Sequence, residues 1–290
     1  MPTPLLRTPQ KRNLLLCLDA FNTLFHPRTP IPQAYAQAAT RHGIPTPHPQ
    51  EVAQSFKQNF AHQSTQHPNY GKATGMGLEK WWSQIIRNIF TPYLKRGQVF
   101  PEALTEELLR TWSSKEGYAL YADVEPFFRR LRRVGVGSGA DLQGLPWHRT
   151  VVGVITNSDA RVPSILSSFG LSVGPRTNED GAAEFREGSD ISFVVLSYDV
   201  GFEKPHPQIF EAAVEMLRKE LQGNEQGLTI DDFEKLYVGD DLEKDYFGAE
   251  KAGWGSVLLR REDGDKKGLG REQIKGKEVT VATSLLDLGG

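Results

Sequence analysis

The sequence predicts an α/β fold, a parallel β-sheet covered by helices, with an all-helical domain inserted into it. Short apolar runs alternate with helical patterns over much of the 290 residues, which is typical of a parallel sheet with helices on both faces. The interval between the first two runs, 19–150, is far longer than one connection needs and has a helical pattern. We therefore expect one sheet-based core and one helical insertion.

Five apolar runs are predicted to be buried strands. They cover 13–18, 151–156, 191–198, 236–238 and 255–259. Runs without polar alternation are typical of strands whose two faces are both covered. We expect all five to lie side by side in one parallel sheet.

Helical patterns separate the later runs. Apolar residues recur at helical spacing after the proline at 207, at Ile209, Phe210, Ala213, Val214, Leu217 and Leu221. Proline suits the first turn of a helix and glycine the position after its end. The segment 242–252 ends before Gly253 and is predicted to be another helix.

The long interval carries four apolar stripes, at 34–42, 52–60, 78–90 and 102–112. Stripes at this spacing predict amphipathic helices that pack on one another. We place a helical cap domain at 30–117 and the core domain at 1–29 and 118–290. The core of the cap itself is expected to take up most of its aromatic and neighbouring side chains, Phe56, Phe60, His62, Trp81, Trp82 and Ile86.

Three stretches rich in glycine and charge interrupt the core pattern, at 135–149, 173–190 and 262–278. Such composition is typical of loops that lie over the surface of a domain. We predict surface loops there and assign them no chemistry.

The composition excludes several classes of protein. A net charge of −2 with 24% charged residues gives no basic surface for nucleic acid or an anionic membrane. The apolar runs are shorter than the roughly 20 residues of a membrane span. Cys17 is the only cysteine, which excludes an internal disulfide and a cysteine zinc site and predicts a cytoplasmic or nuclear protein. The sequence identifies no protein partner.

Polar residues stand at or after the ends of these runs in a fixed order. Asp19 directly follows the run 13–18, Thr156 ends the next, and Lys204 and the acidic segment at 240–245 come later. The carboxyl ends of parallel strands meet at one edge of an open sheet. A carboxylate delivered to that edge can act as a nucleophile.

These residues resemble the motifs of the haloacid dehalogenase superfamily. That resemblance implies a Rossmann-like core with a helical cap inserted just after the first strand. Within the superfamily, Pro68-Asn-Tyr-Gly71, Trp81-Trp82 and Ile89-Phe90 resemble the animal branch of rhythmically expressed and dehalogenase-like hydrolase domain-containing proteins. The resemblance implies a hydrolase and leaves its substrate open.

The residue types fit phosphoryl transfer through an aspartyl ester. Asp19 is the candidate nucleophile. The charge of a phosphoryl group must be neutralised in the transition state. Thr156 offers a hydroxyl, Asn157 a backbone N–H, and Lys204 an ammonium group that also keeps Asp19 ionised.

The acidic residues predict a magnesium site. The carboxylates of Asp19 and Asp240, with the backbone carbonyl of Phe21, offer the hard oxygen ligands that Mg²⁺ prefers. Asp245 is placed behind them, where it can orient a metal-bound water or Lys204. Asp241 is ranked below Asp240 as a ligand.

Substrate contacts are expected from the cap as well as from the core. In capped members of the superfamily, cap residues select the substrate, so the resemblance implies such contacts here. Tyr70 and Gly71 are the candidates, on a loop facing the active site.

Phe21 separates the competing functions. Phosphatases of this superfamily have an aspartate there that protonates the leaving group, and general acid–base help of this kind is worth about 10²–10⁴-fold in rate. We therefore expect slow hydrolysis of a small phosphorylated metabolite, or a degenerate protein that binds without turnover. The segment 19–25 also resembles the opening motif of metal-independent 2-haloacid dehalogenases, but Asp240 favours metal and phosphate chemistry.

Overall fold

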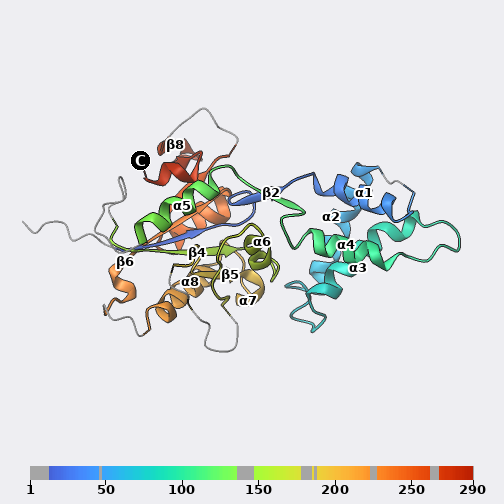
Figure 1. Cartoon of the computed structure of the whole chain (residues 1–290), viewed down its shortest axis with the longest axis horizontal. Coiled ribbons are helices and arrows are strands. Elements are labelled where there is room, and N and C mark those ends of the chain that lie inside the picture. Colours follow the sequence, from blue (N-terminus) through green and yellow to red (C-terminus); the bar gives the residue numbers. More distant parts are fainter. Residues whose placement is uncertain are drawn as a thin grey trace, which may run out of the picture.

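The computed structural model describes residues 13–45, 48–135, 147–177, 185, 188–222, 227–261 and 268–289. A sheet with helices against it forms one body, and a bundle of helices forms a second body beside it (Figure 1). Among the described helices, none combines the length and the apolar character that crossing a membrane requires. The predicted cytoplasmic or nuclear location stays a prediction.

The sheet contains seven strands in the order β5-β4-β1-β6-β7-β9-β8. Every neighbouring pair is parallel except β8 and β9. The strands are β1 Asn13–Leu18, β4 Thr150–Thr156, β5 Phe193–Leu196, β6 Phe233–Gly239, β7 Gly255–Leu259, β8 Gly270–Ile274 and β9 Lys277–Ala282. All residues of β1 are buried, as expected for a strand with both faces covered. The predicted α/β fold with a Rossmann-like sheet is confirmed.

Alternate residues of β1 enter two different apolar clusters. Leu14, Leu16 and Leu18 belong to the cluster that contains Phe128 of helix α5, Val124–Gly135. Leu15 and Cys17 belong to the cluster that contains the apolar stripe of α8, Pro207–Glu220. Because successive side chains of a strand point to opposite faces, α5 and α8 lie on opposite sides of the sheet (Figure 1).

The remaining helical segments of the core are short. They are α6 Val162–Ser168, α7 Ser197–Val200, η2 Ile230–Asp232, the π-helical turn η3 Leu242–Tyr246, α9 Phe247–Lys251 and η4 Leu285–Gly289. The predicted helix at 242–252 is therefore η3 continued by α9, and Gly253 follows it with a positive φ of 79°.

Four helices pack on one another in the second body: α1 Ile31–Arg41, α2 Pro49–Gln66, α3 Leu78–Phe90 and α4 Glu102–Thr111, with the short η1 Thr91–Tyr93 after α3. The four predicted helices are all present. A two-stranded antiparallel ribbon of β2 Phe25–Pro27 and β3 Tyr118–Leu120, which the sequence did not predict, brackets them. The division at 29/30 and 117/118 stays a prediction.

Two predictions about strands and loops were wrong. The strand expected at 191–198 ends at Leu196, opposite Thr156, and Ser197 already begins α7. Part of the loop expected at 262–278 is the β8–β9 hairpin, because Val279 and Val281 alternate into an apolar cluster. Residues 262–267 lie outside the described residues.

The other two predicted loops carry no helix or strand over most of their described parts. Between 135 and 149, Gly135 ends α5 and residues 136–146 lie outside the described residues. Between 173 and 190, isolated bridges join Val173 to Ile191 and Arg176 to Val194. Residues 178–184 and 186–187 are likewise outside the described residues.

Candidate active site

Strand register brings the first predicted site residues to one edge of the sheet. Leu18 of β1 lies opposite Val154 of β4 and Val238 of β6, so Asp19 follows β1 at the level where both neighbours end. The backbone N–H of Asp19 donates to the carbonyl of Val238 at 2.9 Å. Adjacent strands are about 4.8 Å apart, so Thr156 and Asp240 end close to Asp19.

Lys204 joins three elements at this edge. Its Nζ donates to Asp19 Oδ1, Asp245 Oδ1 and the hydroxyl of Tyr237, each at 2.7 Å. The Lys204 side chain is 3% exposed, that of Asp19 9% and that of Asp245 2%. An ammonium group has three N–H donors, so every donor of Lys204 has a partner.

Tyr237, on β6, is a site residue that the sequence analysis missed. Its hydroxyl accepts from Lys204 and donates to the carbonyl of Ile155 on β4 at 2.7 Å. Burial raises the pKa of Tyr237 far above its usual range, so the hydroxyl keeps its proton. The available signal was a tyrosine two residues before Gly239, inside an otherwise apolar run.

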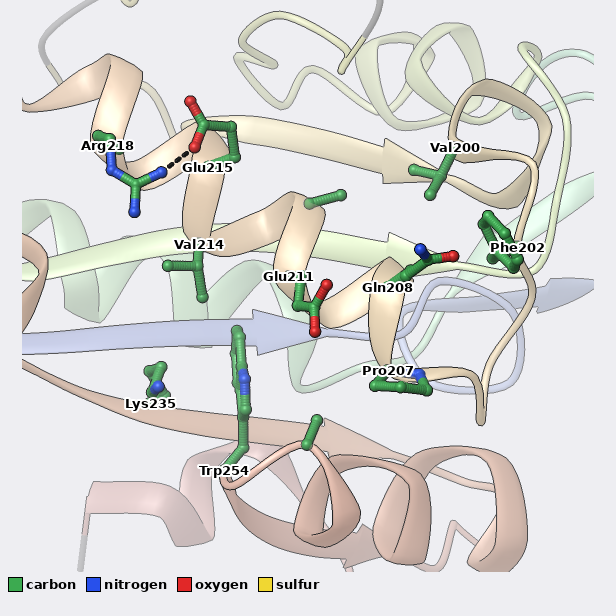
Figure 2. Close-up of a pocket in the computed structure, with 12 residues that line it drawn as sticks. Val200, Phe202, Pro207, Gln208, Glu211, Val214, Glu215, Arg218, Lys235 and Trp254 are labelled. Atoms are coloured by element: carbon green, nitrogen blue, oxygen red, sulfur yellow. Dashed lines mark hydrogen bonds and ion pairs between the residues drawn. The ribbon is translucent and has the colours of Figure 1, made fainter.

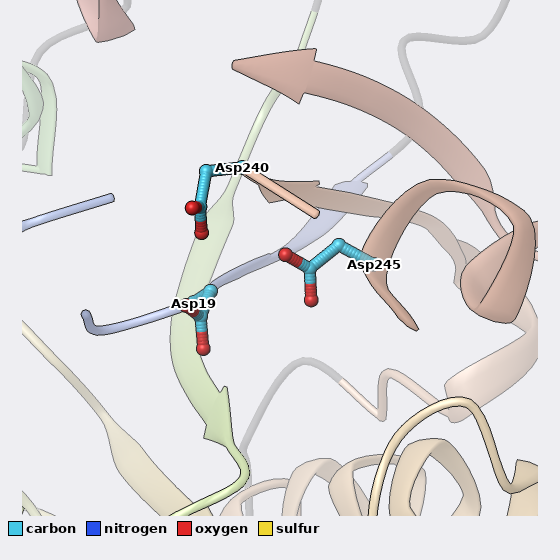
Figure 3. Close-up of side chains that lie close together, drawn as sticks. All are labelled: Asp19, Asp240 and Asp245. Atoms are coloured by element: carbon cyan, nitrogen blue, oxygen red, sulfur yellow. The ribbon is translucent and has the colours of Figure 1, made fainter. Parts of the chain in front are cut away.

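Asp19, Asp240 and Asp245 form an acidic cluster (Figure 3). One ligand atom from each lies within 4.8 Å of the others. Asp245 is held in place on both sides, because its Oδ1 accepts from Lys204 and its Oδ2 accepts from the N–H of Asp241 at 2.9 Å. A Cβ on Gly239 would lie 2.3 Å from Asp245 Oδ2, so this approach requires glycine.

Asp241 has a different place from its neighbour. Its Oδ1 accepts from the backbone N–H groups of Glu243 and Lys244 at 2.9 Å each, as an N-cap of the following helical turn. This oxygen is therefore engaged in fixing the loop that carries Asp240. Asp241 is not part of the acidic cluster.

Burial and charge set the protonation of the cluster. Burial raises the pKa of Asp19 to about 6. The charge of Lys204 opposes this rise, whereas the charges of Asp245 and Asp240 add to it. Burial also raises the pKa of Asp240. For Lys204 burial favours the neutral amine, but Asp19 and Asp245 outweigh it and raise the pKa of Lys204. The ammonium therefore stays charged.

The donor set fits a hard divalent cation. Three carboxylates face one ammonium, which leaves two negative charges in excess when all are ionised, and buried charge is costly unless it is neutralised. Lys204 occupies only one oxygen of Asp19, so Asp19 Oδ2 and the half-buried carboxylate of Asp240 are the donors that suit Mg²⁺.

Thr156 and Asn157 lie where β4 leaves the sheet. Thr156 is 2% exposed. The side-chain amide of Asn157 donates to the carbonyl of Lys204 at 2.9 Å and accepts from its N–H at 2.6 Å. Asn157 thus fixes the backbone from which the Lys204 ammonium reaches Asp19.

Phe21 occupies the second position after Asp19, where an acid would be expected. Its ring packs edge-on against Phe25 at 4.8 Å and Tyr118 at 5.7 Å between centroids. These are residues of the β2–β3 ribbon, so Phe21 is held by the junction of the two bodies.

The predicted cap loop contacts the core beside α7. Asn69 Nδ2 and Lys72 Nζ donate to the carbonyl of Tyr198 at 2.9 and 2.8 Å. The ring of Tyr70 lies 6.3 Å from that of Tyr198, and its pKa is raised, first by burial and then by Asp159 and Glu203. Tyr70 is thus close to the residues that flank the site.

The backbone of the cap loop explains why residue 71 is a glycine. It has a φ of 79°, and a Cβ would lie 3.0 Å from Met76 Cβ. The turn therefore requires glycine.

Trp82, which was expected to lie mainly in the core of the cap, also reaches the other body. Its indole N–H donates to Asp159 Oδ2 at 2.9 Å, and Asp159 in turn pairs with Arg161 at 2.8 Å. Neither Asp159 nor Arg161 was predicted as a site residue. Their spacing after Thr156 was visible in the sequence, but their contact with Trp82 was not.

A surface hollow of about 650 Å³ lies away from these residues. It is lined by α8, the loop before it and residues near Trp254 (Figure 2). None of the predicted site residues lines it, so the chemistry of the acidic cluster gives the better guide to function.

Comparison with known sequences gives one family. The model of the haloacid dehalogenase-like hydrolases matches residues 15–253. Haloacid dehalogenase-like hydrolase domain-containing protein 3 of Bos taurus is 27% identical, over 84% of this chain and 81% of that protein. The rhythmically expressed gene 2 protein of Drosophila melanogaster is 25% identical, over 84% and 82%. These relatives confirm the predicted branch.

Solved structures share the fold across two chemistries. A HAD phosphatase from Thermococcus onnurineus has a TM-score of 0.50 and 19% identity, covering 95% of both chains. A 2-haloacid dehalogenase from Pseudomonas syringae pv. Tomato DC3000 has a TM-score of 0.50 and 18% identity, covering 86% of this chain and 87% of that one. At this identity the likeness shows the fold alone.

Proposed function

Because this chain belongs to the haloacid dehalogenase-like hydrolase family, we propose that it is a slow Mg²⁺-dependent phosphohydrolase acting on a small phosphorylated metabolite. The observation that supports this is the acidic cluster of Asp19, Asp240 and Asp245 with Lys204 as its only ammonium among the described residues. Its excess negative charge calls for a cation, and a phosphate ester needs that cation to approach Asp19.

In the proposed reaction one carboxylate oxygen of Asp19 attacks the phosphorus atom, and the bond between phosphorus and the leaving-group oxygen breaks. Water then attacks the phosphorus of the aspartyl ester, and Asp19 is released as a carboxylate with free phosphate. Lys204 keeps Asp19 in its attacking position and compensates its charge. Asp19, Asp240 and the carbonyl of Phe21 would hold the Mg²⁺ ion, which would neutralise charge on the phosphoryl oxygens when bound.

Thr156 and Asn157 are proposed to donate to the phosphoryl oxygens through a hydroxyl and a backbone N–H. Lys204 is assigned mainly to Asp19, because its three N–H groups all have partners. The leaving-group oxygen takes its proton from water, because Phe21 has none to give. This restricts efficient turnover to good leaving groups.

The test is phosphate release from p-nitrophenyl phosphate with Mg²⁺. Asp19→Asn removes the nucleophile and is expected to lower kcat by at least about 10³-fold. Asp241→Asn is the matched control, because it changes an aspartate of the same segment that lies outside the acidic cluster, and asparagine can still cap the turn. Equal inertness of wild type and Asp19→Asn on all activated esters would contradict the proposal.

The packing of Phe21 favours a second candidate, a degenerate protein that binds a phosphorylated ligand without turnover. Its ring is held by Phe25 and Tyr118, so no acid stands beside Asp19 from this segment. Under this candidate, Mg²⁺ and vanadate bind but no ester is hydrolysed. Dehalogenation is less favoured because of the acidic cluster, and it predicts chloride release from 2-chloropropionate without metal.

A further inference from the structure

A second, largely buried cation lies where the cap meets the core, at Arg161. Arg161 follows β4 by a short loop and makes a side-on pair with Asp159, from Nε to Oδ1 at 2.9 Å and from Nη2 to Oδ2 at 2.8 Å. The Arg161 side chain is 17% exposed and that of Asp159 1%. No step of the proposed hydrolysis uses this pair.

A cap residue covers this pair. Trp82 of α3 donates its indole N–H to Asp159, and its ring stacks on the guanidinium of Arg161 at 4.3 Å. Such stacking fixes the plane of a guanidinium group. Arg161 is therefore held in one orientation by Asp159 at an edge and by Trp82 over a face.

Three of the five N–H donors of the Arg161 guanidinium are left without an acceptor among the described residues. A guanidinium has five N–H donors in a planar fork, and the side-on pair uses only Nε and one N–H of Nη2. Within the described residues, nothing accepts from Nη1. The remaining Nη1/Nη2 edge has the geometry that binds a two-oxygen anion such as a carboxylate.

Arg161 is linked to the segment of Asp19 through Tyr118. Its charge and that of Asp159 both affect the pKa of Tyr118, which burial raises to about 12. The ring of Tyr118 lies 5.7 Å from that of Phe21. The pKa of Tyr70, in the cap, is also affected by the charges of Asp159 and Arg161.

We propose that Arg161 binds a second anionic group, a carboxylate, on the part of the substrate that faces the cap. This rests on the proposed function and narrows its substrate to phosphorylated carboxylic acids. Asp159 and Trp82 are positioning residues, which present the free edge of the guanidinium to that group. The competing explanation is that the pair only fastens Trp82 and the cap to the core.

Binding of two matched phosphonates separates these explanations without requiring turnover. Phosphonoacetate and ethylphosphonate share a phosphonate and a two-carbon chain, and only the first has a carboxylate. Isothermal titration calorimetry on the full chain with Mg²⁺ would measure the affinity for each phosphonate. Wild type is expected to bind phosphonoacetate at least about tenfold more tightly, which corresponds to one charge-assisted bidentate contact.

Two variants test whether Arg161 is the source of that preference. Arg161→Met removes the guanidinium, and Asp159→Asn/Arg161→Met also avoids leaving Asp159 as a buried unpaired charge. Both are expected to bind the two phosphonates equally, with the affinity for ethylphosphonate within about twofold of wild type. Arg110→Met is the control, since Arg110 lies on α4 with a side chain that is 67% exposed.

The outcomes are distinct. The inference is overturned if wild type shows no preference, if it binds neither phosphonate, or if the preference survives in the double variant. It is also overturned if the double variant weakens both phosphonates equally, which is the result of a purely fastening role. Failure of the proposed hydrolysis would give a different result. The preference for phosphonoacetate would be preserved, but no phosphate would be released from p-nitrophenyl phosphate.

Discussion

Two cations lie at the edge of the sheet where β1 and β4 end, Lys204 buried and Arg161 largely buried, and they are held in different ways. Lys204 gives all three N–H groups to Asp19, Asp245 and Tyr237. Arg161 gives two of its donors to Asp159, and the described residues accept no others. All N–H donors of the Lys204 ammonium therefore have acceptors within the protein, whereas Arg161 keeps N–H donors for a further acceptor.

This difference indicates that the two cations have different roles, one in fixing the charges of the site and the other in binding a ligand. A saturated cation in a site of 3% exposure fixes the charges around it and has nothing left for a ligand. A guanidinium with a free edge still has N–H donors for a new acceptor, and a charge-assisted two-point pair with a carboxylate is among the stronger hydrogen-bonded contacts. We therefore assign Lys204 to the reacting carboxylate and Arg161 to the remainder of the substrate.

The largest effect is expected from Lys204→Met. It leaves Asp19 and Asp245 buried without a counter-charge, and loss of one partner in such a group typically costs about 3–5 kcal/mol of folding free energy. Phosphate release is expected to vanish at the same time. Urea unfolding and the p-nitrophenyl phosphate assay measure the two effects.

Arg161→Met is the comparison for that experiment. This substitution leaves only one carboxylate, that of Asp159, without its counter-charge. Asp159 still accepts hydrogen bonds from the indole of Trp82 and from the backbone N–H of residue 161. Its cost is therefore expected to be smaller than that of Lys204→Met. An equal or larger cost would remove the distinction between the two cations.

Phe21→Asp sharpens the comparison from the chemical side. It introduces a carboxylic acid two residues after Asp19, and a general acid is worth at least about 10²-fold in rate. We expect kcat for phosphate esters to rise by about that factor. Phe21→Asn has the same size without the acid, so a gain shared by both variants would mean that space, not proton transfer, limits the reaction.

The core of the fold could be predicted because its strands are continuous apolar runs. β1 and β7 begin and end where expected. The β8–β9 hairpin could not, since its outward positions are charged and only Val279 and Val281 give an apolar alternation. The β2–β3 ribbon joins two three-residue strands from the two ends of the helical insertion, and so short a strand leaves no periodic signal.

The site divides in the same way. Asp19, Lys204, Asp240 and Asp245 could be predicted as one group because each stands in a recognisable motif at the end of a core segment. Tyr237 and Arg161 could not, because their importance depends on contacts between distant segments. The cluster with Trp82 joins residues 77 positions apart in the chain, and no local pattern records that approach.

Tyr237→Phe leaves one N–H donor of the Lys204 ammonium without its acceptor. Lys204 loses its third acceptor and the carbonyl of Ile155 loses its donor. A hydrogen bond to a charged group contributes about 1.5–3 kcal/mol, so we expect a loss of about 2 kcal/mol in unfolding free energy. Tyr246→Phe is the control, because among the described residues that hydroxyl accepts from the N–H of Thr280 and from no charged group. Equal costs in the two variants would show that the charge of Lys204 is not involved.

A third cation, Mg²⁺, extends the comparison to pH. Because burial raises the pKa of Asp19 to about 6, the metal-free protein holds a proton there at lower pH, and Mg²⁺ must displace it. The apparent affinity for Mg²⁺ is therefore expected to rise about tenfold per pH unit up to about pH 6 and to level off above it. Calorimetric titration with MgCl₂ between pH 5 and 8 measures this, with Asp240→Asn as a variant that binds weakly throughout. An affinity that is flat or falls with rising pH would contradict the assignment of Asp19 as a ligand, whereas Arg161 keeps its charge over the whole range.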